Sequence, residues 1–253
     1  MRRALIGYTG FVGGSLARQA EFDSRYNSSN IEEISGGEFE VVACAGAPGA
    51  KWKANKDPDG DRASIERLMR ALEGVRTDTF VLMSTVDVYG VPHGHDEFSP
   101  IDESQVSPYG RHRKLLEDFC VERFNAMVVR LPALFAKGLR KNAVYDLVHD
   151  NNVDRIHPGG SFQFYNMDRT WADAHKALDA GIRLLNVATE PVTVGEIAEK
   201  LFGRTLAVPE GAKPASYDMR SRHSALWGRS DGYLYGREQM LDEMRAFVES
   251  ERS

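Results

Sequence analysis

The amino-terminal stretch RALIGYTGFVGG, residues 3–14, decides the fold of this chain of 253 residues. Residues 3–7 are apolar enough for a buried strand, and residues 11–20 have the apolar spacing of a helix that follows it. Gly7, Gly10 and Gly13 form the pattern G-x-x-G-x-x-G between the two. Glycine at these places permits a tight turn, close packing of the helix on the strand, and approach of a phosphate to the backbone.

A helix that begins at such a turn presents N–H groups without intrahelical partners and the positive end of its dipole. Both features favour a pyrophosphate, so the position of the turn after an apolar strand predicts a dinucleotide-binding site. A purely structural glycine turn is the alternative. Besides the glycines, the residues of this turn expected to contact the dinucleotide are Thr9, Phe11 and Val12.

The end of the predicted second strand bears on the choice between NAD and NADP. Residues 24–30 read SRYNSSN and contain no acid. A carboxylate there would bind the adenosine ribose and repel a 2′-phosphate, whereas Arg25, Asn27 and Ser28 could bind that phosphate. The segment therefore favours NADP, with NAD as the second choice. Alternatively, Ser29 or Asn30 only caps the helix expected at residues 31–34.

Strand-like apolar runs alternate with helical patterns along the chain. Strands are expected at residues 22–26, 40–45, 79–83 and 126–131, and helices at residues 64–73, around 115–120, and at 238–248. This alternation predicts an α/β protein with a doubly wound parallel sheet. The turn-rich, charged residues 49–61 predict a surface loop, either plainly solvated or mobile as a flap.

Composition narrows the class of protein. Hydrophobic residues make up 42% of the chain and charged residues 27%, and the formal net charge is -5. The mild acidity argues against a nucleic-acid or membrane-surface binder, which needs a basic face. No apolar stretch approaches the roughly 20 residues of a membrane span, so a cytoplasmic protein is expected. Cys44 and Cys120 form no CxxC pair, and Cys44 is expected to be a buried thiol.

Four potential metal ligands lie close together in the chain. They fall in a Gly/Pro loop, and no distant further ligand can be identified, so no metal site is predicted. The residues are His93, His95, Asp96 and Glu97.

Several longer segments share their order and spacing with one enzyme family. They read VLMSTVDVYG (81–90), SPYGRHRKLLEDF (107–119), AMVVRLPALFAKG (126–138), SFQFYNMDRTWADAHKAL (161–178) and LLNVATEPVTVGEIAEKL (184–201). Together they resemble the extended short-chain dehydrogenases/reductases of the sugar-nucleotide epimerase/dehydratase kind, over essentially the whole chain. The resemblance implies a Rossmann fold with a dinucleotide-binding domain at residues 1–136. A small substrate lobe at residues 137–253 would return partly to the main sheet.

The resemblance also implies catalytic residues. Thr85 falls at the family's catalytic Ser/Thr, which polarises the substrate oxygen, and Tyr109 at its proton-transferring tyrosine. The family places a lysine four residues after this tyrosine to favour the phenolate and hold the nicotinamide ribose, but here the residue is Arg113. Either Arg113 takes over this work, or a helix distortion brings Lys114 round, or catalysis is weak or lost.

Further contacts follow from the same resemblance. The cofactor is expected to meet Ala45 and Gly46 after the third strand, Ser84 beside Thr85, and Leu131 and Pro132 beside the nicotinamide. Candidates for substrate contact are Asn142, Tyr145, Gln163 and Tyr165, each of which could equally be an ordinary structural residue.

The expected activity is hydride transfer between NAD(P) and a sugar-like hydroxyl or ketone, with a nucleotide sugar as the suggested small-molecule substrate. Reduction and epimerisation begin with the same hydride and proton transfers, and the sequence does not separate them. A homodimer is expected from the family. The alternative is a non-catalytic NAD(P)-binding sensor or regulatory module of the same fold.

Overall fold

The computed structural model describes residues 2–252, and the chain divides into two compact units. Unit 1 comprises the chain up to Val91, Ser99–Arg130 and Asp168–Leu185. Unit 2 comprises Pro92–Phe98, Leu131–Met167 and the chain from Asn186 onward. The division into residues 1–136 for the dinucleotide and 137–253 for the substrate stays a prediction, because it concerns what each part binds.

Unit 1 is built on a six-stranded sheet with the order β2-β1-β3-β4-β5-β9. The strands are β1 (Arg3–Ile6), β2 (Ser24–Tyr26), β3 (Glu38–Cys44), β4 (Arg76–Thr85), β5 (Met127–Leu131) and β9 (Leu184–Asn186). β1 runs parallel to both β2 and β3, and β3 runs parallel to β4. The chain places β2 on one side of β1 and then crosses to the other side for β3. Strand order therefore switches direction beside β1, where ligands of such sheets bind.

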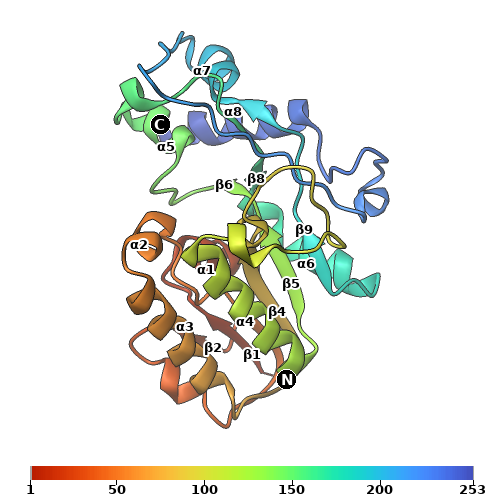
Figure 1. Ribbon diagram of the computed structural model, residues 1–253. Coiled ribbons are helices and arrows are strands. Elements are labelled where there is room, and N and C mark those ends of the chain that lie inside the picture. Colours follow the sequence, from red (N-terminus) through yellow and green to blue (C-terminus); the bar gives the residue numbers. More distant parts are fainter. Residues whose placement is uncertain (1, 253) are drawn as a thin grey trace. The chain divides into compact units, whose positions relative to one another are not determined.

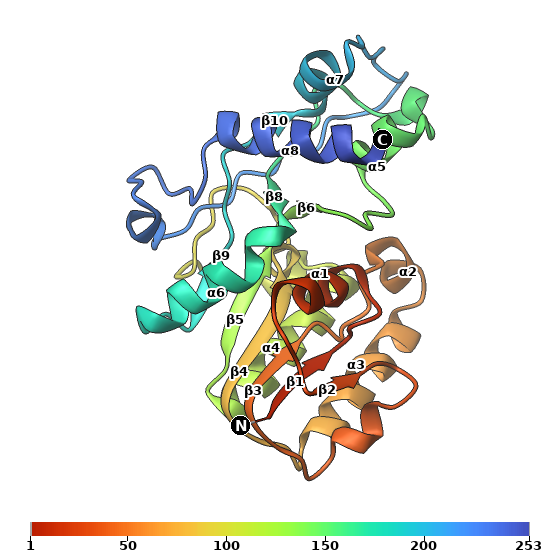
Figure 2. The same ribbon diagram turned by 180° about the vertical axis from the view of Figure 1, so that it is seen from behind.

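Helices cover both faces of this sheet, as the opposite views of Figures 1 and 2 show. On one face lie α1 (Phe11–Gln19) and α6 (Thr170–Asp179), joined by a hydrogen bond of 2.9 Å from the Trp171 N–H to Gln19 Oε1. The other face carries α2 (Lys51–Lys56), α3 (Pro58–Leu72) and α4 (Pro108–Phe124). This arrangement confirms the doubly wound α/β fold predicted from the alternation of strands and helices.

Short 3-10 helices connect several of these elements. They are η1 (Ile31–Ile34), η2 (Val86–Tyr89), η3 (Glu103–Gln105), η4 (Val153–Arg155), η5 (Met167–Arg169) and η6 (Ser224–Trp227). Two of them matter for the site, because η1 follows β2 and η2 follows β4.

Both cysteines are buried, and burial raises the pKa of the Cys44 thiol to about 11.

The prediction of a loop at residues 49–61 was wrong, because this stretch folds into α2 and the start of α3. Asp57 is the N-cap of α3, and its carboxylate accepts a hydrogen bond of 3.1 Å from the Gly60 N–H. Pro58 occupies the first helical position, where its missing N–H costs nothing. The Asp-Pro pair that looked like a turn is a helix start.

A buried ion pair connects α4 to the sheet. Arg130 on β5 donates to both carboxylate oxygens of Glu117, at 3.1 and 2.6 Å, and its Nη1 donates to the Tyr89 hydroxyl at 2.7 Å. Ser84 at the end of β4 donates to the same carboxylate at 2.5 Å. Burial disfavours the charged guanidinium, but the hydrogen bonds and charge of Glu117 outweigh it and raise the pKa of Arg130. Four residues from separate elements are thus fixed to one another.

Unit 2 contains two small sheets and three helices. β6 (Ala133–Phe135) pairs in parallel with β8 (Phe164–Asn166), and β7 (Ser161–Phe162) pairs antiparallel with β10 (Val192–Thr193). The helices are α5 (Ala143–His149), α7 (Val194–Phe202) and α8 (Arg237–Arg252). No helix in residues 2–252 is long and apolar enough to cross a membrane.

The acidic end of residues 92–98 has a structural role in unit 2. Glu97 is 9% exposed and accepts hydrogen bonds from the Asn186 N–H at 2.8 Å, the Ser221 hydroxyl at 2.6 Å and the Arg222 N–H at 2.8 Å. Its carboxylate therefore holds two distant segments of unit 2 together.

Candidate functional site

The glycine turn after β1 is packed too tightly for side chains at two of its positions. Gly7 has a φ of +84°, and a Cβ there would lie 2.2 Å from the Ala45 carbonyl oxygen. A Cβ on Gly13 would lie 2.1 Å from the Gly7 carbonyl oxygen. These two glycines are therefore required by the packing of the turn between β3 and α1.

Gly10 differs from its two neighbours in the pattern. It is the N-cap of α1 in an extended conformation, and a Cβ there would lie 3.3 Å from the Gly7 carbonyl oxygen, a contact that a small shift relieves. No side chain caps α1, and its first turn contains no acid. The missing side chain of Gly10 leaves room outside the turn, and the helix start has no negative charge of its own. Both observations fit an anionic ligand at this helix N-terminus.

The segment after β2 has the turn expected at the adenosine end of a dinucleotide. Arg25 and Ser28 are exposed. The Asn27 side chain accepts a hydrogen bond from the Ser29 N–H at 2.8 Å and donates to the Tyr8 hydroxyl at 3.3 Å. Of the acids in η1, Glu32 is paired with Arg67 at 2.6 Å. The end of β2 thus presents Arg25 without an acid in its own segment.

The capping alternative for this segment is wrong for Asn30. Asn30 is the N-cap residue of η1, but its side chain makes no capping hydrogen bond. Instead it accepts from the Asn27 N–H at 2.7 Å and donates to the Arg25 carbonyl at 3.2 Å. Asn30 therefore shapes the turn that follows β2.

Thr85 and Tyr109 lie at the ends of elements that meet on one face of unit 1. Thr85 is the last residue of β4, and its hydroxyl accepts a hydrogen bond of 3.1 Å from the Asp87 N–H. Tyr109 is half-buried in the first turn of α4, after Ser107 as N-cap and Pro108. α4 contacts both β4 and η2. The two residues are therefore carried by adjoining elements, and their catalytic roles stay predictions.

Arg113 lies one turn after Tyr109 and is 3% exposed. Its guanidinium carbon lies 4.1 Å from the centroid of the Tyr109 ring. One Nη donates to the Asp61 carboxylate and the other to the Pro48 carbonyl, while Nε has no partner among the described residues. Asp61 is buried too, and its Oδ2 also lies 2.7 Å from His112 Nδ1. The guanidinium of Arg113 therefore forms an ion pair with a buried carboxylate.

These surroundings determine the pKa of Tyr109. Burial raises the pKa of the phenol above its ordinary value, and the charge of Arg113 lowers it without compensating. The prediction that Arg113 favours the phenolate has the right sign, but the effect of burial is larger. Lys114 does not take the place of Arg113, since α4 is a continuous helix and the Lys114 ammonium is paired with Asp118.

The remaining candidate contacts have structural partners. Ser84 donates to Glu117, and a Cβ on Gly46 would lie 2.8 Å from Ile6 Cγ2. Ala45 follows β3, Leu131 is the buried last residue of β5, and Pro132 follows it half-buried. Their contacts with a cofactor stay predictions.

The substrate candidates belong to unit 2. Asn142 caps α5 by accepting from the Val144 and Tyr145 N–H groups at 3.0 and 3.1 Å. Gln163 is 1% exposed, and its amide bonds the backbone of Thr189 and Met219. Tyr165 is fully buried, and the Tyr145 ring lies 4.3 Å from that of His149. These roles are those of structural residues, and contact with substrate stays a prediction for all four.

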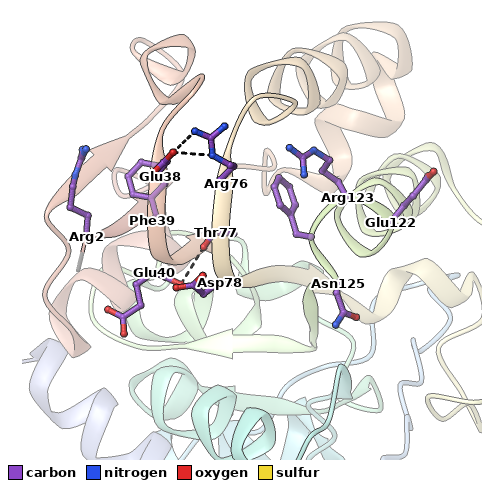
Figure 3. Close-up of a pocket in the computed structure, with 11 residues that line it drawn as sticks. Arg2, Glu38, Phe39, Glu40, Arg76, Thr77, Asp78, Glu122, Arg123 and Asn125 are labelled. Carbon is purple, nitrogen blue, oxygen red and sulfur yellow. Dashed lines mark hydrogen bonds and ion pairs between the residues drawn. The ribbon is translucent and has the colours of Figure 1, made fainter.

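A shallow hollow of about 870 Å³ lies elsewhere in unit 1, at the amino ends of β3 and β4 (Figure 3). Arg76 there is paired with Glu38, and Arg123 donates to the Glu73 carbonyl at 3.0 Å. Because doubly wound sheets bind ligands at the carboxyl ends of their strands, this hollow is not the expected dinucleotide site.

Sequence reasoning missed Lys51 and Asn55 on α2, Asp61 on α3, and the Glu117–Arg130 pair. The Asp57-Pro58 pair was the one local signal available, because it marks the start of α3 and limits how much of residues 49–61 can be loop. The ion pairs join residues far apart in the chain, and no local pattern announces them.

Comparison with protein families and curated proteins gives one match. The model described as "NAD dependent epimerase/dehydratase family" matches residues 21–193. The comparison with curated proteins found no match.

Solved structures share the fold at low sequence identity. A dTDP-4-dehydrorhamnose reductase from Bacillus anthracis in complex with NADP has a TM-score of 0.74 and 18% identity, with 98% of each chain covered. A UDP-glucuronic acid 4-epimerase from Bacillus cereus in complex with NAD has a TM-score of 0.72 and 14% identity, covering 100% of this chain and 99% of the other. MoeE5 in complex with UDP-glucose and NAD has a TM-score of 0.72 and 16% identity, with 100% of both chains covered.

The packing of the turn makes a prediction about stability. Gly13→Ala is expected to lower the free energy of unfolding by about 2 kcal/mol, because the added Cβ collides with a backbone carbonyl. Gly14→Ala is the matched control, since its Cβ would meet the Tyr8 carbonyl oxygen at an ordinary 3.5 Å. It should raise the same free energy by about 0.5–1 kcal/mol, because alanine favours helix. Urea denaturation measures both, and equal stability of the two variants would contradict the packing.

Proposed function

Because the chain belongs to the NAD dependent epimerase/dehydratase family, we propose that it is an NAD(P)-dependent enzyme. In this proposal it transfers hydride between the nicotinamide and a hydroxyl or ketone carbon of a nucleotide-linked sugar. The observation that carries the proposal is the uncapped, acid-free start of α1 behind Gly10, at the same edge of the sheet as Thr85. The solved structures of this fold that hold NAD, NADP or UDP-glucose support it.

The residues of unit 1 fit such a cofactor. The first N–H groups of α1, at Phe11, Val12 and Gly13, would bind the pyrophosphate. Ala45 and Gly46 follow the end of β3, where the cofactor would pass. Arg25, exposed at the end of β2 in a segment without acids, favours a 2′-phosphate and therefore NADP over NAD.

Tyr109 and Thr85 would handle the proton. In oxidation of a hydroxyl, the hydride leaves the sugar carbon for the nicotinamide and the hydroxyl proton passes to the Tyr109 oxygen, while Thr85 hydrogen-bonds the same substrate oxygen. In reduction the movements reverse, and Tyr109 protonates the oxygen that forms. Burial raises the pKa of Tyr109, which favours the protonated phenol over the phenolate.

The proposal extends to quaternary structure and location. We expect a homodimer in the cytoplasm, as the family resemblance implies. A second candidate function is a non-catalytic NAD(P)-binding sensor. It is favoured by the burial of Tyr109, which raises the pKa of the phenol by more than the charge of Arg113 lowers it.

Calorimetric titration tests the cofactor site. We expect NADPH to bind the protein, and Gly10→Ala to weaken the binding more than about tenfold, because the new Cβ occupies the space left for the phosphates. Gly14→Ala is the control, since its Cβ lies inside the helix start and should leave affinity unchanged. If the folded protein binds none of NADPH, NADP⁺, NADH and NAD⁺, the proposed function is wrong.

The choice of cofactor is tested at Arg25. Arg25→Ala should weaken NADPH binding about tenfold or more through loss of a charged phosphate contact, and leave NADH binding unchanged. Competition titrations of the wild type and the variant with both cofactors measure this. A variant that loses affinity for both cofactors equally would contradict the 2′-phosphate contact.

Enzyme and sensor are separated at Tyr109. Once a screen of nucleotide sugars has found a substrate, Tyr109→Phe should lower kcat at least about a hundredfold, because no other group at that position can carry the proton. NADPH affinity should stay within about threefold of the wild type, which shows that the site is intact. Unchanged turnover would exclude Tyr109 as the proton donor.

A further inference from the structure

Helix α2 and Pro48, three residues before its start, are bonded to the elements that carry Thr85 and Tyr109. Asn55 Oδ1 accepts a hydrogen bond of 3.0 Å from the Tyr109 N–H. Lys51 Nζ lies 2.6 Å from Asp87 Oδ1, in the turn that follows Thr85. The Pro48 carbonyl accepts from Arg113. Residues of the stretch 49–61, which the sequence predicted to be a loop, are thus bonded to the elements around Tyr109.

Charged groups face Tyr109 from four elements. Arg113 and His112 belong to α4, Asp61 to α3, Asp87 to η2 and Lys51 to α2. Arg113 and Asp61 form a buried pair whose side chains are 3% and 4% exposed. The charge of Arg113 lowers the pKa of Tyr109 by more than the charge of Asp61 raises it. Asp87 is the second carboxylate near Tyr109, and its side chain is 18% exposed. Its negative charge opposes formation of a phenolate unless a cation balances it.

Lys51 is a cation paired with the Asp87 carboxylate. We propose that Lys51 is a positioning residue for Tyr109: its ammonium, held by Asp87, offsets the negative charge that this carboxylate places beside the phenol and acts in the same direction as Arg113. The Lys51 side chain is 42% exposed, so its charge is accessible from solvent and not buried with the Arg113–Asp61 pair. This inference deepens the proposed function and rests on it, because it concerns the group that would move the proton.

The direction of each effect follows from the charges. The charge of Asp87 raises the pKa of Tyr109, and the charge of Lys51 lowers it. Removal of Lys51 therefore removes a charge that favours the phenolate, whereas removal of Asp87 removes a charge that opposes it. The double variant removes both charges and should return close to the wild type.

A single fluorinated tyrosine at position 109 provides the readout. Fluorination lowers the pKa of the phenol into an accessible range, and one ¹⁹F resonance reports its ionisation without interference from the other tyrosines. We expect Lys51→Gln, which keeps a hydrogen-bond donor for Asp87, to raise the apparent pKa by about half a unit or more. Asp87→Asn should lower it by a similar amount, and Lys51→Gln with Asp87→Asn should lie near the wild type. Lys51→Arg should restore the wild-type value.

Lys53→Gln is the matched control, because Lys53 is an exposed lysine on the same helix and should leave the resonance unchanged. A shift in Lys51→Gln no larger than in Lys53→Gln, in proteins with equal thermal stability, would overturn the inference. If Lys51→Gln does not fold, Asp87→Asn decides the test. A raised or unchanged apparent pKa of residue 109 in Asp87→Asn would then overturn the inference. The titration needs neither cofactor nor substrate, so its failure is distinct from failure of NADPH binding.

Discussion

Two backbone carbonyls, those of Gly7 and Ala45, occupy the space that side chains at Gly13 and Gly7 would need. The rest of the site depends on this close packing. It fixes the start of α1 beside the ends of β1 and β3, where strand order switches. The consequence is a helix N-terminus without a cap or an acid at the edge of the sheet where ligands of this architecture bind.

A second layer of contacts holds Thr85 and Tyr109, the residues proposed to handle the proton, in the same unit. The buried Glu117 carboxylate binds Arg130 on β5 and Ser84 on β4, and so fixes α4 against the sheet. Tyr109 at the start of α4 is then held beside Thr85 and η2. Replacement of the family's lysine by Arg113 is accommodated by a buried partner, Asp61, and by stacking of the guanidinium on the Tyr109 ring. In this arrangement the charge of Arg113 still lowers the pKa of Tyr109, but burial of the phenol raises it by more.

The sheet and the glycine turn could be predicted because their signals are local. Runs of apolar residues mark β3 and β4, and the spacing of Gly7, Gly10 and Gly13 marks the turn. Residues 49–61 could not be assigned this way, because Gly, Pro and Asp are typical of both loops and helix starts. The ion pairs could not be predicted either: Arg113 lies 52 positions from Asp61, and Lys51 lies 36 from Asp87, so only the fold brings them together.

The central claim is that the start of α1 binds the phosphates of a dinucleotide. Hydrogen exchange of backbone amides, measured with and without saturating NADPH, tests it most directly. The account predicts slowed exchange at residues 10–14 and in the turn after β2, at the carboxyl edge of the sheet. Unchanged exchange there, with protection confined to the hollow around Arg76 and Arg123, would contradict it.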